Sequence, residues 1–133
     1  MIVVDTNVLA YFWMQGEYTK YAKSLYKSDD EWISPFLWRS EFRSILALYI
    51  RKGVLKLEDS IEIMRSAQFM MKSREYSVDS IFVLEKINTC SLSAYDLEFV
   101  TLAESLNLKL ITLDKKMIAE FPDIVISLKN YNQ

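Results

Sequence analysis

The sequence predicts an α/β fold with a parallel sheet. Short apolar runs suited to buried strands alternate along the chain with longer segments of helical periodicity. Gly and Pro contribute two residues each to the 133, far fewer than a turn-rich all-β or disordered chain would carry. No repeat, low-complexity tract or flexible linker divides the sequence, so residues 1–133 are expected to form a single domain.

The first half of the chain is expected to hold two strands and three helices. The run 2–4 is apolar and typical of a buried strand. Ser34 followed by Pro35 predicts a helix start, because serine is a favourable N-cap and proline suits the first helical position. Gly53 predicts the end of that helix. The expected order is strand 2–4, helix 8–13, helix 18–28, strand 32–33 and helix 34–52.

The second half alternates helices and strands in the same way. Residues 93–106 show a clear amphipathic pattern, with Phe99 and Leu102 in the apolar stripe. Glu98 and Thr101 fall on the polar face and are expected to be solvated. The expected order is helix 57–72, strand 75–78, helix 79–87, helix 93–106, strand 108–112, helix 115–120 and strand 124–126.

The composition excludes several kinds of chemistry. Because the chain has no histidine, it cannot build a Ser-His triad, a Cys-His dyad or a zinc site with histidine ligands. Cys90 is the sole cysteine, so an intrachain disulfide is excluded and nothing points to an oxidising compartment. Acid–base or metal chemistry in this chain must therefore use carboxylates.

The charge balance and the hydropathy favour a cytoplasmic protein without membrane contact. The 16 basic and 18 acidic residues give a net charge of −2, which argues against binding nucleic acid through bulk positive charge. The start of the chain lacks a basic leader, and no apolar run approaches the ~18 residues that a membrane helix needs.

Four carboxylates interrupt the apolar pattern. Asp5 and Asp114 each follow an expected strand, where an aspartate often caps the next helix. Glu41 falls in an apolar stripe, where its burial is costly unless a Lys or Arg pairs with it. Asp96 also falls in an apolar stripe, although Ser93 and Asp96 together fit a capping box. Caps and ion pairs therefore remain alternatives for each residue taken singly.

The expected topology brings these four acids together. Asp5 and Asp114 follow strands, Asp96 lies in the first turn of its helix, and Glu41 lies about two turns into another. These positions border the crevice beyond the carboxyl ends of a parallel sheet, where open α/β proteins bind ligands. Clustered carboxylates repel one another unless a cation compensates them, and oxygen ligands suit Mg²⁺ or Mn²⁺. The residues alone therefore predict a hard-metal site.

The order of these motifs resembles that of the PIN-domain ribonucleases, the family that includes the VapC toxins of toxin–antitoxin pairs. The resemblance covers nearly the whole chain, and the gaps between successive acids suit a compact member. Leu97 is a departure, because family members often place a small residue after the third acid. The matching segments are Val4-Asp5-Thr6-Asn7-Val8-Leu9, Ser40-Glu41-Phe42, Tyr95-Asp96-Leu97-Glu98-Phe99 and Leu110-Ile111-Thr112-Leu113-Asp114.

This resemblance implies a three-layer α/β/α sandwich and metal-dependent cleavage of RNA phosphodiester bonds. The acids of the family correspond to Asp5, Glu41, Asp96 and Asp114. Asp5, Asp96 and Asp114 would hold Mg²⁺ or Mn²⁺, and Glu41 would orient or deprotonate the attacking water. No histidine base is required for such chemistry.

Supporting residues and partners follow from the same resemblance. Thr6 or Asn7 would orient the first aspartate, and Thr112 would line the site. Lys115 and Lys116, next to the last acid, are candidates for contact with RNA, although a solvated helix face is the simpler interpretation. An RNA substrate, an antitoxin protein and a homodimer are the partners that the resemblance implies.

Two other functions remain open. A PIN-like module that binds RNA or a protein without cutting would usually have lost an acid, and all four are present here. A phosphohydrolase of the haloacid-dehalogenase type also begins with an aspartate, but it needs a second aspartate at the position of Asn7. The expected function is therefore a Mg²⁺- or Mn²⁺-dependent endoribonuclease that acts as the toxin of a toxin–antitoxin pair.

Overall fold

Five parallel strands form one sheet in the order β3-β2-β1-β4-β5. This computed structural model describes residues 1–131 of the chain. The central strands β1 and β4 pair with Val3 opposite Leu110, and the strand order reverses between them. The strands are β1 (Ile2–Val4), β2 (Trp32–Pro35), β3 (Glu75–Tyr76), β4 (Leu110–Thr112) and β5 (Val125–Ser127).

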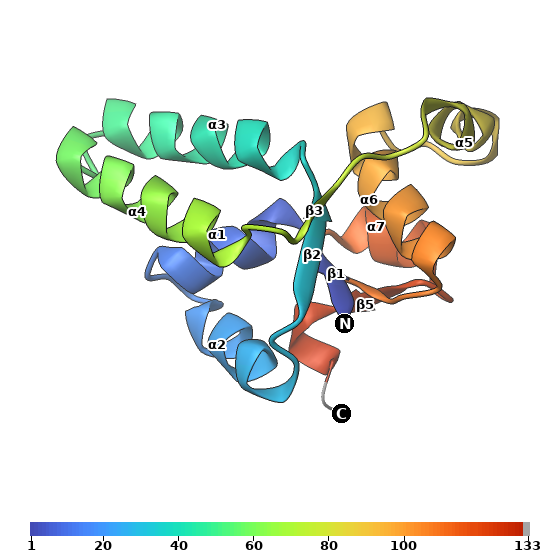
Figure 1. Cartoon of the computed structure of the whole chain (residues 1–133), viewed down its shortest axis with the longest axis horizontal. Coiled ribbons are helices and arrows are strands. Elements are labelled where there is room, and N and C mark those ends of the chain that lie inside the picture. Colours follow the sequence, from blue (N-terminus) through green and yellow to red (C-terminus); the bar gives the residue numbers. More distant parts are fainter. Residues whose placement is uncertain (132–133) are drawn as a thin grey trace.

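Helices cover both faces of the sheet and complete a three-layer α/β/α sandwich (Figure 1). In Figure 1, α1 to α4 lie to the left of the sheet, and α5 to α7 lie to its right. The helices are α1 (Thr6–Trp13), α2 (Thr19–Ser28), α3 (Trp38–Arg51), α4 (Leu57–Met70), α5 (Ser80–Glu85), α6 (Ala94–Leu106) and α7 (Lys115–Glu120). Two short 3-10 turns, Ile87–Thr89 and Leu128–Asn130, were not expected from the sequence.

The central strands are apolar because helices cover them on both faces. Val3, Val4, Leu110 and Ile111 have no solvent exposure. This burial explains why β1 and β4 read as continuous apolar runs rather than as an alternating pattern. Large side chains of β2 and α3, including Trp32, fill the space beside them.

The helix start expected at Ser34 and Pro35 is wrong, because both residues lie in β2. The Ser34 hydroxyl donates to the Val4 carbonyl oxygen at 2.6 Å instead of capping a helix. The N–H groups of Ser34 and Phe36 donate to carbonyl oxygens near and within β3, and the alternation of the strand requires no such bond from Pro35. The helix begins three residues later, at Trp38.

Thr101 is also a correction, because it is buried rather than solvated. α6 packs against β1, β2 and β4 on one side and against α5 on another. More of the helix circumference is therefore covered than a simple two-faced amphipathic pattern allows. The other expected elements are present, with ends that differ by a few residues from those expected.

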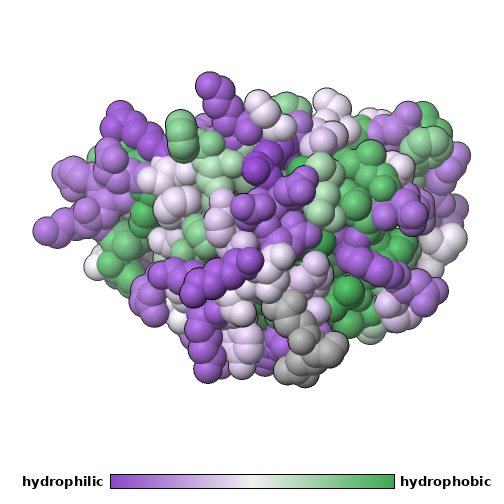
Figure 2. Space-filling view, turned by 60° about the horizontal axis from the view of Figure 1, so that its bottom comes forward, coloured by the Kyte–Doolittle hydropathy of each residue, from purple (hydrophilic) through white to green (hydrophobic). Residues whose placement is uncertain are grey.

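The surface carries an apolar area over the helices of the right-hand layer. Figure 2 shows broad hydrophobic areas on the right half of the molecule, the half that holds α5 to α7 in Figure 1. α5 contributes Ile81, Phe82 and Leu84, which are 61%, 49% and 62% exposed. Within the described residues, no helix combines the length and apolar character needed to cross a membrane.

Candidate functional site

Asp5 and Asp114 lie beyond the carboxyl ends of the two central strands. Both therefore border the point where the strand order reverses. Each also caps the helix that follows it. Asp5 Oδ1 accepts a hydrogen bond from the Thr6 N–H at 2.8 Å. Asp114 Oδ1 accepts from the N–H groups of Lys116 at 2.9 Å and Met117 at 3.1 Å.

The Thr112 side chain joins the two aspartates. Its buried hydroxyl donates to Asp5 Oδ2 at 2.7 Å and accepts from the Asp114 N–H at 3.0 Å. Asn7 adds a second connection, because its Nδ2 lies 3.3 Å from Asp5 Oδ2 and 3.2 Å from Thr112 Oγ1. Asn7 Oδ1 accepts in turn from the Leu113 N–H at 3.3 Å. These bonds fix the Asp5 carboxylate against the end of β4.

Glu41 reaches the same group of residues from α3. Its Oε1 accepts a hydrogen bond from the Thr6 hydroxyl at 2.7 Å. In the described part of the chain, no Lys or Arg lies within ion-pair distance of Glu41. Arg39 and Arg43, the arginines closest to Glu41 along α3, bind other partners. The ion-pair alternative for Glu41 is therefore not realised among these residues.

Asp96 lies in the first turn of α6. Its backbone N–H donates to Ser93 Oγ at 3.0 Å, so Ser93 caps the helix as the capping-box interpretation expected. Burial and the charge of Asp114 raise the pKa of the half-buried Asp96 carboxyl group. Ser93 and Lys116 oppose this rise. Asp96 and Asp114 thus interact electrostatically although they come from different elements.

The pKa of Asp5 is strongly raised. Asp5 is only 8% exposed, and burial raises its pKa from 3.8 to about 7. The hydrogen bond from Thr112 lowers this pKa, whereas the charges of Glu41 and Asp96 raise it. Burial likewise raises the pKa of Glu41, against the hydrogen bond from Thr6 and together with the charge of Asp96. These carboxyl groups therefore repel one another.

Glu98 is a further acid of this group, and the expectation that it is solvated is wrong. It lies on α6 two residues after Asp96 and is half-buried. Burial raises the pKa of Glu98, and its charge raises the pKa of Glu41. The amphipathic pattern placed Glu98 on the polar face, so the only available signal was its closeness to Asp96 in sequence.

Lys115 and Lys116 begin α7 directly after Asp114. The Lys116 ammonium donates to the Ser91 carbonyl oxygen at 3.0 Å, and its charge lowers the pKa of Asp96. Lys115 is exposed. Both lysines therefore lie beside these acids, and their contact with RNA stays a prediction. We call Asp5, Glu41, Asp96, Glu98 and Asp114 together the acidic group.

The family model of the PIN domain matches residues 2–123 of this chain. The chain belongs to the PIN-domain family. The match spans β1 to α7 and includes Asp5, Glu41, Asp96 and Asp114. No curated protein is similar enough in sequence to be matched to it.

Three solved structures share the fold of this PIN domain over nearly its whole length. FitAcB from Neisseria gonorrhoeae has 16% identity and a TM-score of 0.75, over 98% of this chain and 99% of that one. FitAB bound to the IR36 DNA fragment has 14% identity and a TM-score of 0.75, over 100% and 99%. A toxin–antitoxin complex from Klebsiella pneumoniae has 14% identity and a TM-score of 0.69, over 96% and 98%.

The donor set of this PIN domain suits a hard divalent cation. PIN domains generally use divalent metal ions. The acids here offer only oxygen ligands, and their negative charges repel one another. Within residues 1–131, no three acidic or cysteine side chains are already gathered into a ligand set. A bound ion would therefore rely on few protein ligands and on water, as Mg²⁺ commonly does.

Proposed function

We propose that this PIN-domain protein is a Mg²⁺- or Mn²⁺-dependent endoribonuclease, with residues 1–133 acting as one domain. The supporting observation is the acidic group at the reversal of strand order, whose charges raise one another's pKa values. The charges of Glu41 and Asp96 raise the pKa of the buried Asp5, and no basic side chain among residues 1–131 forms an ion pair with these three. A bound divalent cation would compensate this repulsion.

The proposed chemistry divides the acids into two roles. Asp5, Asp96 and Asp114 would hold the ion, which when bound polarises the phosphodiester and acidifies a water molecule. Glu41 would orient that water and accept its proton, and the Thr6 hydroxyl holds Glu41 Oε1 in place. The water oxygen forms a bond to phosphorus, and the bond from phosphorus to a sugar oxygen breaks.

Asn7 and Thr112 would support this chemistry through Asp5. Both side chains bind Asp5 Oδ2, so they orient the carboxylate that the ion would contact. Lys115 and Lys116 would contact phosphates of the RNA beside the acids, which compensates locally for the net charge of −2. We expect this activity in the cytoplasm.

Thermal unfolding of the wild type and of Asp96→Asn, with and without Mn²⁺ or Mg²⁺, tests the metal-dependent function. An ion at ~100 times its Kd should stabilise the wild type by about 2.7 kcal/mol, a shift of roughly 10 °C in the midpoint. In Asp96→Asn, the metal-free midpoint should rise because repulsion is relieved, and the response to metal should shrink. Cleavage of an unstructured RNA should fall in the same variant.

Asp30→Asn is the matched control, because Asp30 is exposed and lies outside the acidic group. This variant should keep the full metal response. If the wild-type midpoint ignores both ions, the metal-dependent function is wrong. The alternative of a PIN-like module that binds RNA or a protein without cutting then becomes the better explanation.

We also propose that the protein is the toxin of a toxin–antitoxin pair. A groove of about 580 Å³ lies between α1 and the α3–α4 hairpin. Asn7, which binds Asp5, lines this groove. Ile45 and Leu48 supply apolar walls, and Glu17 supplies a negative charge. An antitoxin segment with apolar side chains and a basic residue fits this chemistry. Such a segment would block access to the acids beside Asn7.

Co-expression with the protein encoded beside it tests the antitoxin proposal. A complex should form with the wild type and fail with Leu48→Glu, because a charge would enter the apolar groove. Phe69→Glu is the control, because Phe69 is exposed and lies outside this groove. Equal binding by Leu48→Glu would contradict the groove as the docking site.

A homodimer is the last part of the proposal. α5 buries only Val83 and exposes Ile81, Phe82 and Leu84. A contiguous apolar patch of this kind typically marks a protein–protein interface. A second copy of the chain would cover it.

A further inference from the structure

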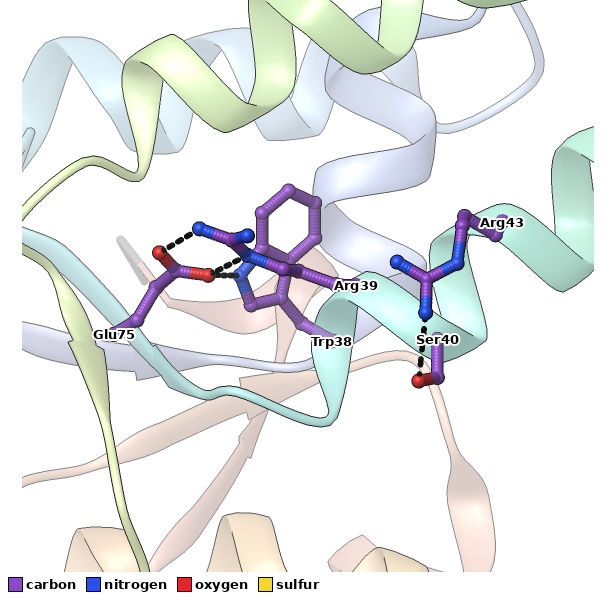
Figure 3. Close-up of polar contacts among 5 residues, drawn as sticks. All are labelled: Trp38, Arg39, Ser40, Arg43 and Glu75. Carbon is purple, nitrogen blue, oxygen red and sulfur yellow. Dashed lines mark hydrogen bonds and ion pairs between the residues drawn. The ribbon is translucent and has the colours of Figure 1, made fainter.

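One buried carboxylate ties the base of the α3–α4 hairpin to the sheet. The side chain of Glu75, the first residue of β3, is only 6% exposed. It accepts hydrogen bonds from Trp38 Nε1 at 2.8 Å and from Arg39 Nη2 at 2.7 Å, and a second bond from Arg39 Nε. Figure 3 shows the Trp38 and Arg39 side chains converging on the two Glu75 oxygens.

This contact replaces a cap at the start of α3. The N-cap residue, Leu37, makes no side-chain hydrogen bond to the helix. The bidentate pair between Arg39 and Glu75 holds the first turn instead, and such a pair fixes both distance and orientation. Burial favours a raised pKa for Glu75, but the hydrogen bonds from Arg39 and Trp38 lower it, so the carboxylate is charged.

The same first turn carries Glu41, which was expected about two turns into the helix, because α3 begins at Trp38 and not at Ser34. Arg39 precedes Glu41 by two residues, and Glu41 binds the Thr6 hydroxyl at 2.7 Å. The start of α3 is therefore fixed at two points, by Glu75 of β3 and by Thr6 of α1. We expect a change at the first point to alter the tilt of α3 and so to displace the Glu41 carboxylate at the second.

We propose that Glu75, Arg39 and Trp38 form a latch that sets the position of Glu41 in the acidic group. These are positioning residues, which act on the reaction only through Glu41. The effect on turnover rests on the proposed function, whereas the effect on the position of Glu41 does not. Displacing a catalytic group by about 1 Å can cost on the order of 100-fold in rate, so the latch controls turnover.

A double-mutant cycle in protein stability tests the mechanical link. Arg39→Gln opens the latch, and Thr6→Val removes the hydroxyl that binds Glu41. If the latch holds Glu41 against Thr6, Thr6→Val should lower the stability of the Arg39→Gln variant by less than it lowers that of the wild type. The combined effect on the unfolding equilibrium constant should then fall short of the product of the single effects by about threefold or more.

Arg43→Gln is the matched control, because Arg43 lies one turn further along α3 and, among residues 1–131, binds only the Ser40 hydroxyl, at 3.1 Å (Figure 3). Its cycle with Thr6→Val should be additive. If Arg39→Gln does not fold, Glu75→Gln opens the latch more mildly, since it keeps an acceptor for Trp38. An additive cycle between the latch variant and Thr6→Val overturns the inference.

RNA cleavage supplies the second readout, well below the unfolding midpoint of each variant. Arg39→Gln should lower kcat about tenfold or more with KM changed less than twofold, and Arg43→Gln should keep the wild-type kcat. A full kcat in Arg39→Gln, or a change in KM alone, overturns the positioning role. If the wild type cleaves no RNA, the proposed function fails, and the stability cycle still decides the latch.

Discussion

Asp5 lies under two opposing influences. Burial and the charges of Glu41 and Asp96 favour its neutral form, whereas the hydrogen bonds from Thr112 and Thr6 favour its charged form. Burial dominates, so the pKa of about 7 makes Asp5 partly protonated near neutral pH. A cation that binds this carboxylate must therefore displace a proton, and metal binding should strengthen as pH rises.

The raised pKa of Asp5 predicts how stability depends on pH. The folded state binds more protons than the unfolded state between the ordinary value of 3.8 and about 7. The free energy of unfolding should therefore fall as pH rises through this window, and Asp5 should contribute up to about 4 kcal/mol to the fall. Asp5→Asn should lack this part of the pH dependence, because asparagine does not ionise. The variant should therefore be more stable than the wild type at pH 8. Urea unfolding with a chelator present measures both.

Asp30→Asn controls for the loss of a charge at an exposed position. Its stability should follow that of the wild type across the whole pH range. Parallel pH curves for Asp5→Asn and the wild type would show that Asp5 titrates normally in the folded protein.

The sequence identified those acids that occupy positions where the pattern calls for an apolar residue. Asp5, Glu41 and Asp96 interrupt apolar positions, so their burial could be expected, and the structure brings them into electrostatic contact. Glu98 could not be found in this way, because it occupies a polar position of α6 and becomes half-buried only through packing. Their chemical roles stay predictions.

At the scale of elements, Gly53 shows how a single backbone position ends α3. Its φ of +74° lies in the left-handed region, and a Cβ there would meet no atom within 4 Å. Gly53→Ala should therefore lose about 1 kcal/mol from backbone strain alone. Gly53→Asn should lose less, because asparagine tolerates this conformation, as Asn107 does at the end of α6. The midpoints of urea unfolding compare the two variants.

Equal losses in both variants would contradict backbone strain as the cause. Gly16→Ala offers a contrast, because its added Cβ would lie 3.0 Å from the Tyr11 ring without any left-handed φ. Its effect should come from side-chain contact, which the ring can relieve by a small shift.

Local signals predicted most elements, and they failed where a distant strand competes. Gly53 ends its helix as expected, since only the local backbone decides this. Ser34 and Pro35 carry an equally strong local signal for a helix start, yet they pair with Glu75 and Tyr76 about 40 residues away. The pairing of β2 with β3 outweighs the helix cap that Ser34 would form, and no local sequence pattern reveals this pairing.

At the scale of the whole molecule, the apolar surface of α5 predicts self-association. Phe82→Ser should convert a homodimer into a monomer, because it removes an apolar side chain that is 49% exposed. Light scattering after gel filtration measures the mass of each variant. Phe36→Ser is the control, since Phe36 is similarly exposed, at 50%, and lies outside α5. A wild type that runs as a monomer at all concentrations would contradict the dimer.

The pairing of β1 with β4 also governs when the acidic group comes into existence. Thr112 binds Asp5 across 107 residues, so the segment that carries Thr112 must have been synthesised before the two meet. A chain still being synthesised, with residues 110–114 not yet delivered to the sheet, has no assembled acidic group. Under the proposed function, chains interrupted before residue 110 would therefore lack the assembled site and should not cleave RNA. The order of the strands alone provides this delay.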